Sequence, residues 1–363
     1  MDELDAVAAR VTDRAIGRPV GPWTLEVYPT LRCNLDCAFC DTTDRHRPAV
    51  GELSPAEWAR VVDSAAAYGA RRIYVLGGGE PMVSAATPGI LRRAKAHGMT
   101  GMLTTNGTRL GEDLVRLLVE IGWDEVHVSI DGATAATHDA LRGRAGAFRR
   151  AVSAACRLRR ARDAAGAGVP RVWLHTVITS RNVEEVPAIV RLAAALGADG
   201  VEFDSLVVYR PEQRALALDA EGEARLRACA QEGVEESLRL GLRTTLARFV
   251  DPARARRGAG VPVTPERPGA LGRAPCLKPW HHLVVDAGGR ISACCVLSGQ
   301  GERISVEAPD PVRVAWEESA WLGALRAAMR AGAPPERCAE CSPNLLAHEA
   351  AIGERLAARD GAP

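Results

Sequence analysis

Three cysteines, Cys33, Cys37 and Cys40, follow a strand-like apolar run with the spacing CxxxCxxC. A cubane [4Fe–4S] cluster contains four irons, so a protein that supplies three thiolates leaves one iron open to a small molecule. Such a cluster can take part in chemistry instead of only relaying an electron. The spacing by itself also leaves open a zinc site, with His46 as the fourth ligand, or a redox dithiol.

Three further motifs follow strand-like runs: GGGEP at residues 77–81, TTNG at 104–107 and SIDG at 129–132. Glycines at a strand end allow the backbone to approach a ligand closely, and a carboxylate such as Glu80 can accept from an ammonium group. Asn106 or Asp131 taken alone would be interpreted as a helix cap or a turn residue. The carboxyl ends of parallel strands meet at one edge, so these motifs are expected to join the cysteines in a single site.

Strand-like runs alternate with amphipathic helical stretches from about residue 24 to 206. Such alternation with short connections requires parallel strands and right-handed crossovers. Six units are too few for a closed eight-stranded barrel, so the sequence predicts an α/β fold, a partial (β/α)6 TIM-like barrel, rather than a flat doubly wound sheet. The expected strands are 24–30, 72–76, 101–105, 125–130, 172–179 and 201–205, and the expected helices are 55–68, 87–97, 112–121, 148–164 and 183–196. Ser54, Pro55 and Glu57 form a capping-box signature before the first of these helices.

The chain divides into five expected segments. They are an N-terminal extension (1–21), the partial barrel (22–210), a helical linker region (211–275), a cysteine-rich module (276–345) and a C-terminal tail or helix (346–363). The linker region contains a long helical stretch (221–240) and a Pro/Gly/Arg-rich run (251–275). The module contains an expected hairpin of 283–286 and 290–293, turned by Gly288 and Gly289.

A second set of cysteines occupies the C-terminal module. Cys276, Cys294, Cys338 and Cys341 could ligate every iron of an auxiliary [4Fe–4S] cluster, or form a zinc ribbon. Cys295, next to Cys294, is interpreted as a spare buried thiol, an alternate ligand or a hydrogen-atom donor. The remaining two cysteines, Cys156 and Cys229, lie in helical stretches and are expected to be core residues.

The composition and charge indicate which partners and which location to expect. The net charge of +1 gives no reason to expect nucleic acid or a membrane surface as a partner. The chain has no apolar run of about twenty residues, and its acidic N-terminus lacks a signal-peptide core. These two features lead us to expect a cytoplasmic location, where ten cysteines are expected to be metal ligands rather than disulfides.

Residues 22–206 resemble the radical S-adenosylmethionine (radical SAM) enzymes, through CNLDCAFC, GGGEP, TTNG and VSIDG in that order. The resemblance implies that Cys33, Cys37 and Cys40 hold a [4Fe–4S] cluster whose open iron chelates the amino and carboxylate groups of SAM. It also implies a flavodoxin- or ferredoxin-type reductant. The side chains and glycines expected to contact SAM are Phe39 at the adenine, Gly78, Gly79 and Glu80 at the ammonium group, Asn106 at the strand end, Ser129 and Asp131 at the ribose, and Arg142 at the carboxylate.

The C-terminal cysteine module resembles the Twitch module, a shortened relative of the SPASM domain. The resemblance rests on CLKPW at 276–280, on Gly289 and on the single terminal CxxC. No cysteine follows Cys341, so one auxiliary [4Fe–4S] cluster is expected. His281 and His282 come directly after this run. His282 is a candidate proton acceptor or a group that tunes the cluster, and a structural hydrogen bond is the alternative interpretation. His175, Glu202 and Asp204 could face the barrel lumen and hold a polar substrate.

This layout resembles the radical SAM dehydrogenases, and some epimerases, of aminocyclitol and sugar antibiotic biosynthesis. We expect oxidation of an alcohol in a small polar substrate (aminocyclitol, sugar or nucleoside), with the auxiliary cluster accepting an electron. One alternative is an epimerase in which Cys295 donates a hydrogen atom. Another is a maturase of a ribosomally made peptide, which the presence of only about 22 residues before the first strand disfavours.

Overall fold

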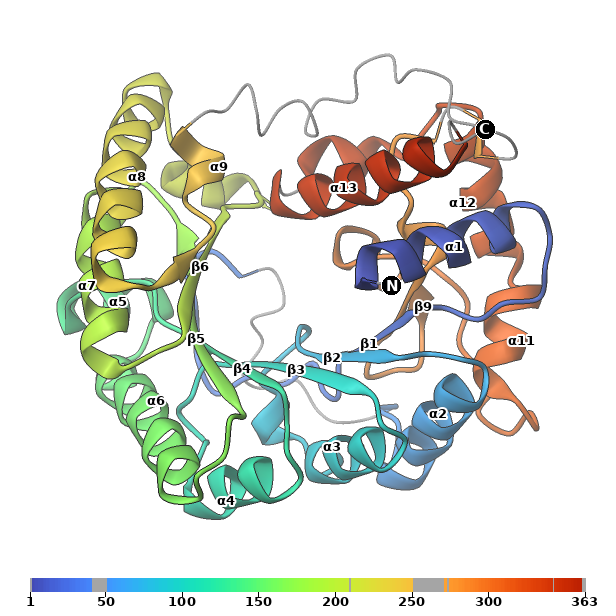
Figure 1. Cartoon of the computed structure of the whole chain (residues 1–363), viewed down its shortest axis with the longest axis horizontal. Coiled ribbons are helices and arrows are strands. Elements are labelled where there is room, and N and C mark those ends of the chain that lie inside the picture. Colours follow the sequence, from blue (N-terminus) through green and yellow to red (C-terminus); the bar gives the residue numbers. More distant parts are fainter. Residues whose placement is uncertain are drawn as a thin grey trace.

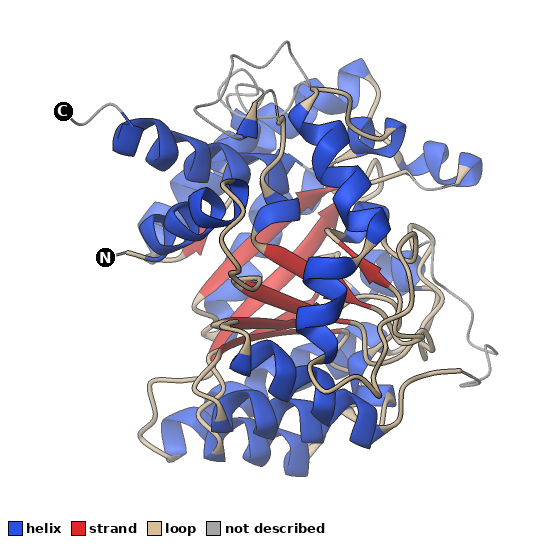
Figure 2. Ribbon diagram, turned by 90° about the vertical axis from the view of Figure 1, so that its right-hand side faces the viewer, coloured by secondary structure: helices blue, strands red, loops and turns tan. Residues whose placement is uncertain are grey.

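The structure is a computed structural model, and it describes residues 2–40, 51–208, 210–250, 271–272, 274–341 and 343–360. In these ranges one curved sheet forms the centre, with strand order β7-β6-β5-β4-β3-β2-β1-β8-β9. Helices lie on its outer side (Figures 1 and 2). The strands are β1 (Thr24–Val27), β2 (Arg72–Val75), β3 (Thr100–Thr105), β4 (Glu125–Ser129), β5 (Arg171–Ile178), β6 (Gly200–Ser205), β7 (Arg243–Thr244), β8 (His282–Val285) and β9 (Ile291–Ser292).

The helices fall into two groups. Those around the barrel are α2 (Pro55–Ala67), α3 (Thr87–Ala96), α4 (Glu112–Glu120), α5 (Ala135–Arg142), α6 (Ala147–Ala164), α7 (Val186–Leu196), α8 (Ala220–Leu240) and α9 (Ala247–Val250). The others are α1 (Glu3–Ala15) at the N-terminus and α11 (Pro311–Glu318), α12 (Ala320–Arg330) and α13 (Pro343–Asp360) in the C-terminal region. None of the helices in the described ranges is both long and apolar enough to cross a membrane.

Alternation along each strand separates the apolar core from the lumen of the barrel. On β5, residues 172, 174, 176 and 178 are buried, while His175 and Val177 line an internal cavity. On β2, Ile73 and Val75 are buried, while Tyr74 lines the same cavity. Successive side chains of a strand point to opposite faces, so one face packs against the helices and the other is free to carry polar groups. The core therefore lies between the sheet and its helices.

The expected partial barrel is confirmed, and the expected strands and helices match closely in position. The helix expected at 55–68 is α2, and its capping box of Ser54 and Glu57 is present, with Pro55 in the first turn. Several elements were not expected, among them the two-residue β7, which pairs with β6, and α5, which follows β4. The run 251–275 and His46 lie outside the described residues, apart from 271–272 and 274–275. The segment boundaries remain predictions.

The expected hairpin forms, and its first strand joins the barrel. β8 and β9 pair antiparallel, and Gly289 in the turn has a φ of 77°, which glycine adopts without strain. β8 also pairs in parallel with β1, with Thr24 opposite His282 and Val27 opposite Val285. A strand from the cysteine-rich module thus extends the barrel sheet, which the sequence pattern did not predict because sheet neighbours distant in sequence leave no local signal.

The N-terminal segment forms a helix that the sequence pattern did not predict. Its helix α1 is capped by Asp2 and lies beside α13 (Figure 1). Glu3 forms an ion pair with Arg72 at the start of β2 and accepts from Trp23 Nε1 at 3.2 Å, just before β1. α1 therefore lies across the amino ends of the first barrel strands.

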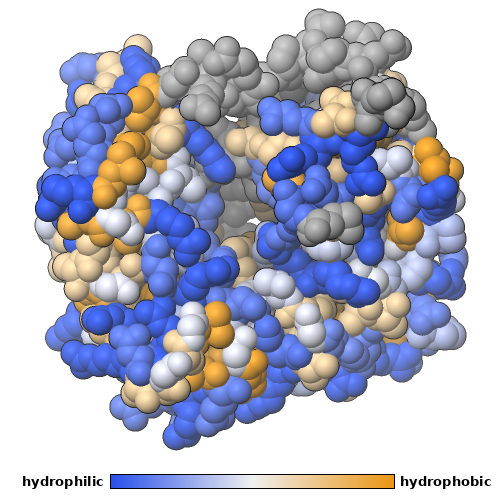
Figure 3. All heavy atoms as spheres, in the orientation of Figure 1, coloured by the Kyte–Doolittle hydropathy of each residue, from blue (hydrophilic) through white to orange (hydrophobic). Residues whose placement is uncertain are grey.

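The molecular surface that faces the viewer in Figure 3 is mostly hydrophilic, and its hydrophobic side chains form small separate groups.

Candidate functional site

The loop that carries Cys33, Cys37 and Cys40 is held on one side by the GGGEP motif. Gly79 N donates to Thr30 O at 2.8 Å and Glu80 N donates to Arg32 O at 2.9 Å. A Cβ atom on Gly79 would lie 2.0 Å from Arg32 O, closer than any real contact. The glycine is thus required because two backbones touch at this point.

The end of α5 holds the loop on its other side. Ala38 N donates to Leu141 O at 2.9 Å, and Asp36 N donates to Arg142 O at 3.2 Å. Gly143 has a φ of 64°, and a Cβ there would lie 2.2 Å from Asp36 O. Two segments distant in sequence therefore fix the cysteine loop by backbone contacts.

The three thiols gather in one small cluster with hydrogen-bond donors directed at their sulfurs. Leu35 N lies 3.4 Å from Cys33 Sγ, Asn106 Nδ2 lies 4.0 Å from the same sulfur, and Arg142 Nη1 lies 3.8 Å from Cys37 Sγ. Burial raises the pKa of Cys33, and it raises that of Cys37 to about 12. Metal binding must therefore displace the thiol protons, and the donors would stabilise the thiolates that result.

The described residues contain no group of three or more His, Cys, Asp or Glu side chains placed to bind a single metal ion. The zinc alternative also needs His46, which lies outside the described residues.

Glu80 and Asn106 connect the cysteine loop to β3. The Glu80 carboxylate is 3 % exposed and accepts from Thr105 Oγ1 at 2.6 Å, Met82 N at 3.0 Å and Asn106 N at 2.7 Å. Burial raises the pKa of Glu80. An ionised carboxylate offers about four acceptor positions, so about one remains for an ammonium group. The Asn106 side chain donates to Asn34 Oδ1 at 3.0 Å, in addition to its contact with Cys33.

Asp131 and Arg142 form a buried ion pair beside the thiols. Asp131 Oδ2 accepts from the Arg142 guanidinium, and Asp131 Oδ1 accepts from Val177 N at 2.9 Å. The guanidinium also lies over the Phe39 ring, 5.2 Å from its centroid. Asp131 therefore links α5 to β5, and its role at the SAM ribose, like those of Ser129 at the end of β4 and Arg142 at the carboxylate, remains a prediction.

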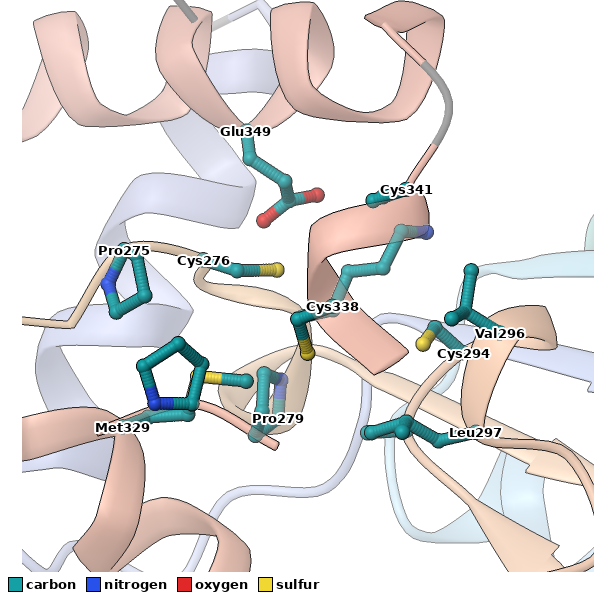
Figure 4. Close-up of a pocket in the computed structure, with 13 residues that line it drawn as sticks. Pro275, Cys276, Pro279, Cys294, Val296, Leu297, Met329, Cys338, Cys341 and Glu349 are labelled. Carbon is teal, nitrogen blue, oxygen red and sulfur yellow. The ribbon is translucent and has the colours of Figure 1, made fainter. Parts of the chain in front are cut away.

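The four C-terminal cysteines line one cavity (Figure 4). Cys276 precedes the 3-10 turn Lys278–Trp280, Cys294 precedes the turn Cys295–Leu297, and Cys338 lies in the turn Glu336–Glu340. Burial raises the pKa of Cys338 to about 11 and of Cys341 to about 12. The walls between the thiols are largely apolar, including Pro279, Leu297 and Met329. The four cysteines that the sequence pattern grouped therefore lie around one cavity.

Cys295 belongs to a different cavity from its neighbour Cys294. It lines the barrel lumen, whereas Cys294 lines the four-cysteine cavity. Burial, with Glu26 adding to it, raises the pKa of Cys295 well above its ordinary value, so the thiol is neutral at physiological pH. This placement favours a hydrogen-atom donor over an alternate ligand, and the role itself remains a prediction.

The lumen is a cavity of about 490 Å³ that reaches from Phe39 and Gly77 to His282 and Cys295. This volume lies in the usual range for small-molecule sites. His175, Glu202 and Asp204 all line it, as the sequence allowed. His175 Nε2 lies 2.9 Å from Asp204 Oδ2, and His127 Nδ1 lies 3.1 Å from Glu202 Oε2.

Three buried side chains from β8, from β1 and from the residue after β1 are hydrogen-bonded to one another. His282 Nε2 lies 2.9 Å from Glu26 Oε2, and Tyr28 Oη donates to Glu26 Oε1 at 2.7 Å. Burial lowers the pKa of His282 to about 4, and nearby Lys278 adds to this effect. Burial opposes ionisation of Glu26, but the hydrogen bond from His282 and the neighbouring charges outweigh it and lower the Glu26 pKa. Sequence reasoning found His282 and missed Glu26, whose signal was a carboxylate in an otherwise apolar strand.

Comparison with known proteins identifies the family. The model of the Radical SAM superfamily matches residues 27–193. PqqA peptide cyclase of Gluconobacter oxydans is 30% identical over 283 residues, which cover 76% of this chain and 71% of that protein. The chain belongs to the radical SAM superfamily. Members of this superfamily related to SPASM-type proteins use a [4Fe–4S] cluster with SAM, plus auxiliary clusters.

Other radical SAM relatives match more narrowly. The AdoMet-dependent heme synthase of Methanosarcina barkeri is 36% identical over 169 residues, which cover 47% of this chain and 46% of that protein. The chain thus spans about half the length of such curated relatives. Among solved structures, Streptococcus suis SuiB bound to S-adenosylmethionine has a TM-score of 0.66 at 16% identity, covering 85% of this chain and 68% of SuiB. Native anSMEcpe with bound AdoMet has a TM-score of 0.63 at 15% identity, covering 93% of this chain and 98% of that chain. These two likenesses show the fold.

The expected likeness to aminocyclitol and sugar dehydrogenases is not supported. The relatives found are peptide cyclases, a mycofactocin maturase and heme synthases. The four-cysteine layout reports how a cluster is held, so it does not identify the substrate, whose choice depends on lumen side chains.

We predict that Gly79→Ala displaces the cysteine loop, because its Cβ would meet Arg32 O at 2.0 Å. After anaerobic reconstitution, iron should fall from about eight to about four atoms per chain, with the C-terminal site still filled. Gly89→Ala is the matched control, since a Cβ at that helical position meets nothing within 4 Å. Full iron content in Gly79→Ala would show that the contact is not needed.

A second prediction concerns pH and the histidine behind Glu202. Burial opposes protonation of His127, but Glu125 and Glu202 outweigh it and raise its pKa to about 9. The stabilisation is complete below the unfolded pKa of about 6.5 and is lost as pH rises through about 9. The free energy of unfolding of the wild type should therefore exceed that of His127→Gln by up to a few kcal/mol at pH 6, and the difference should shrink by pH 9.5. Denaturant titrations across this range measure it, and a constant difference would refute the charged network.

Proposed function

We propose that this radical SAM enzyme modifies a peptide, with one segment of the peptide inserted into the barrel lumen. The similarity to PqqA peptide cyclase of Gluconobacter oxydans carries this proposal. That match is 283 residues long and so extends well past the region 27–193 that defines the superfamily. Similarity beyond the shared barrel motifs supports a likeness in the parts that contact substrate.

We assign Cys33, Cys37 and Cys40 to the cluster that binds SAM, and Cys276, Cys294, Cys338 and Cys341 to the auxiliary cluster. When bound, the cluster and SAM supply a 5′-deoxyadenosyl radical that abstracts a hydrogen atom from a substrate carbon. The chain's own residues prepare the site for this chemistry. Leu35, Asn106 and Arg142 direct N–H donors at the sulfurs, and Glu80 keeps about one acceptor position for the SAM ammonium group.

The lumen orients the substrate. Its carboxylates Glu202 and Asp204 are each held by a histidine, so they offer fixed acceptors on one wall. α1 lies across the amino ends of the first barrel strands, so a substrate enters from the carboxyl ends, where the cysteine loop lies. The cavity of about 490 Å³ fits a few side chains, and the rest of a peptide would remain outside.

His282 is the group placed to take a proton from the substrate. Its Nε2 donates to Glu26, so the lone pair of the neutral ring is on Nδ1. Net oxidation of a substrate by two electrons releases a proton in addition to the abstracted hydrogen atom. Oxidation of a substrate radical makes the departing proton strongly acidic, so His282 Nδ1 can accept it with the pKa of the ring lowered to about 4. Glu26 acts through His282 as a positioning residue.

The substrate class can be tested by isotope transfer. The reconstituted enzyme is incubated anaerobically with SAM, dithionite and either a deuterated peptide pool or deuterated aminocyclitols and sugars. Deuterium should enter 5′-deoxyadenosine from the peptides, as detected by mass spectrometry. Transfer only from an aminocyclitol or sugar would restore the small-molecule dehydrogenase hypothesis. Solvent deuterium in an unoxidised product would instead indicate quenching by a thiol such as Cys295.

The proton acceptor has its own test with the substrate so identified. His282→Ala should still produce 5′-deoxyadenosine containing substrate deuterium, but the oxidised product should fall about 100-fold or more. Glu26→Gln should reduce the product less, because Nδ1 remains in place. His97→Ala removes an exposed histidine far from the lumen and should leave both readouts unchanged. Equal loss of 5′-deoxyadenosine and product in His282→Ala would point to a structural role instead.

A further inference from the structure

Lys278 lies in the wall between the lumen and the four-cysteine cavity. It comes two residues after Cys276, and its side chain lines both cavities. It is 8 % exposed, although lysine is rarely buried to this extent. Only two of the 46 Lys and Arg residues are lysines, Lys95 and Lys278. A lysine at this buried position is therefore unusual for this chain.

The Lys278 ammonium group has no hydrogen-bond or ion-pair partner among the described residues. The two nearest carboxylates act on it through space but are bonded elsewhere. Glu26 is bonded to His282 and Tyr28, and Glu349 accepts from His281 and from Leu277 N. The ammonium nitrogen is not among the fully enclosed polar atoms that lack a partner, so it is open to a cavity in which an anion can pair with it.

A lysine side chain is ordinarily charged at physiological pH. Because the Lys278 side chain lines the four-cysteine cavity, its positive charge faces the space between the thiols.

We propose that Lys278 raises the reduction potential of the auxiliary cluster and so makes it an electron acceptor for the lumen. This inference rests on the assignment of the four cysteines to that cluster. Four thiolates make the cluster anionic, and reduction adds one more negative charge, so a nearby cation stabilises the reduced form more than the oxidised form. In the oxidation proposed above, a bound auxiliary cluster would take the electron that the substrate radical gives up, and His282 Nδ1 would take one proton, so charge and atoms balance.

The proposal is tested in a background that contains only the auxiliary cluster. Cys33, Cys37 and Cys40 are replaced by alanine, and the midpoint potential is measured by redox titration monitored by electron paramagnetic resonance. Lys278→Met keeps the length of the side chain and removes its charge. It should lower the equilibrium constant for reduction at least tenfold, which is about 59 mV for one electron. Lys278→Arg should keep most of the parent potential, and Lys95→Met, which removes the other lysine, should not change it.

The outcomes separate this inference from the proposed function. An unchanged potential in Lys278→Met overturns the role of Lys278 while the cluster assignment stands. Failure of the triple-alanine parent to take up about four irons overturns the assignment of the four cysteines. A cluster lost in Lys278→Met but retained in Lys278→Arg shows that a cationic side chain is needed to hold the cluster rather than to set its potential, and it overturns the proposal. A cluster lost in both variants shows that the shape of Lys278 matters rather than its charge, and it overturns the proposal.

Discussion

The parallel pairing of β1 with β8 is the contact on which the rest of the molecule depends. β1 precedes the loop of Cys33, Cys37 and Cys40, and β8 follows Cys276 in the auxiliary module. Their hydrogen bonds place the two cysteine groups on one sheet, with the lumen between them. The same register sets Thr24 opposite His282, so Glu26, two residues further along β1, lies within reach of that histidine.

The lumen shows how an α/β barrel can keep charged groups inside at tolerable cost. Three carboxylates on the barrel strands that line the lumen are each bonded to a neighbouring side chain. Glu26 is bonded to His282 and Tyr28. Asp204 is bonded to His175, and Glu202 to His127. Removing one partner of such a pair costs more than the pair contributes, so these contacts constrain the wall as a unit. They also leave a lumen with oriented acceptors, as substrate recognition requires.

Much of the fold and of the cofactor chemistry was predictable because its signals are local. Alternation located the barrel strands, Ser54 and Glu57 marked the start of a helix, and cysteine spacing marked both cysteine groups. The substrate class was not predictable from the cysteine layout, which describes cluster binding. Glu26 and Lys278 were missed because each is a single polar residue whose importance depends on neighbours more than two hundred residues away or on a second cavity.

The sequence by itself determined the chemistry: its motifs and thiols lie within short segments, and their residue types limit which cofactors can bind. Tertiary structure decided which of these residues face one another. Only the folded chain shows that Cys295 opens to the lumen while Cys294 lines the auxiliary cavity, although the two are adjacent. Only the β1–β8 pairing brings Glu26 to His282. The physical reason is that spacing along the chain fixes only local geometry. Which cavity a side chain faces depends on strand pairing and packing across the whole domain.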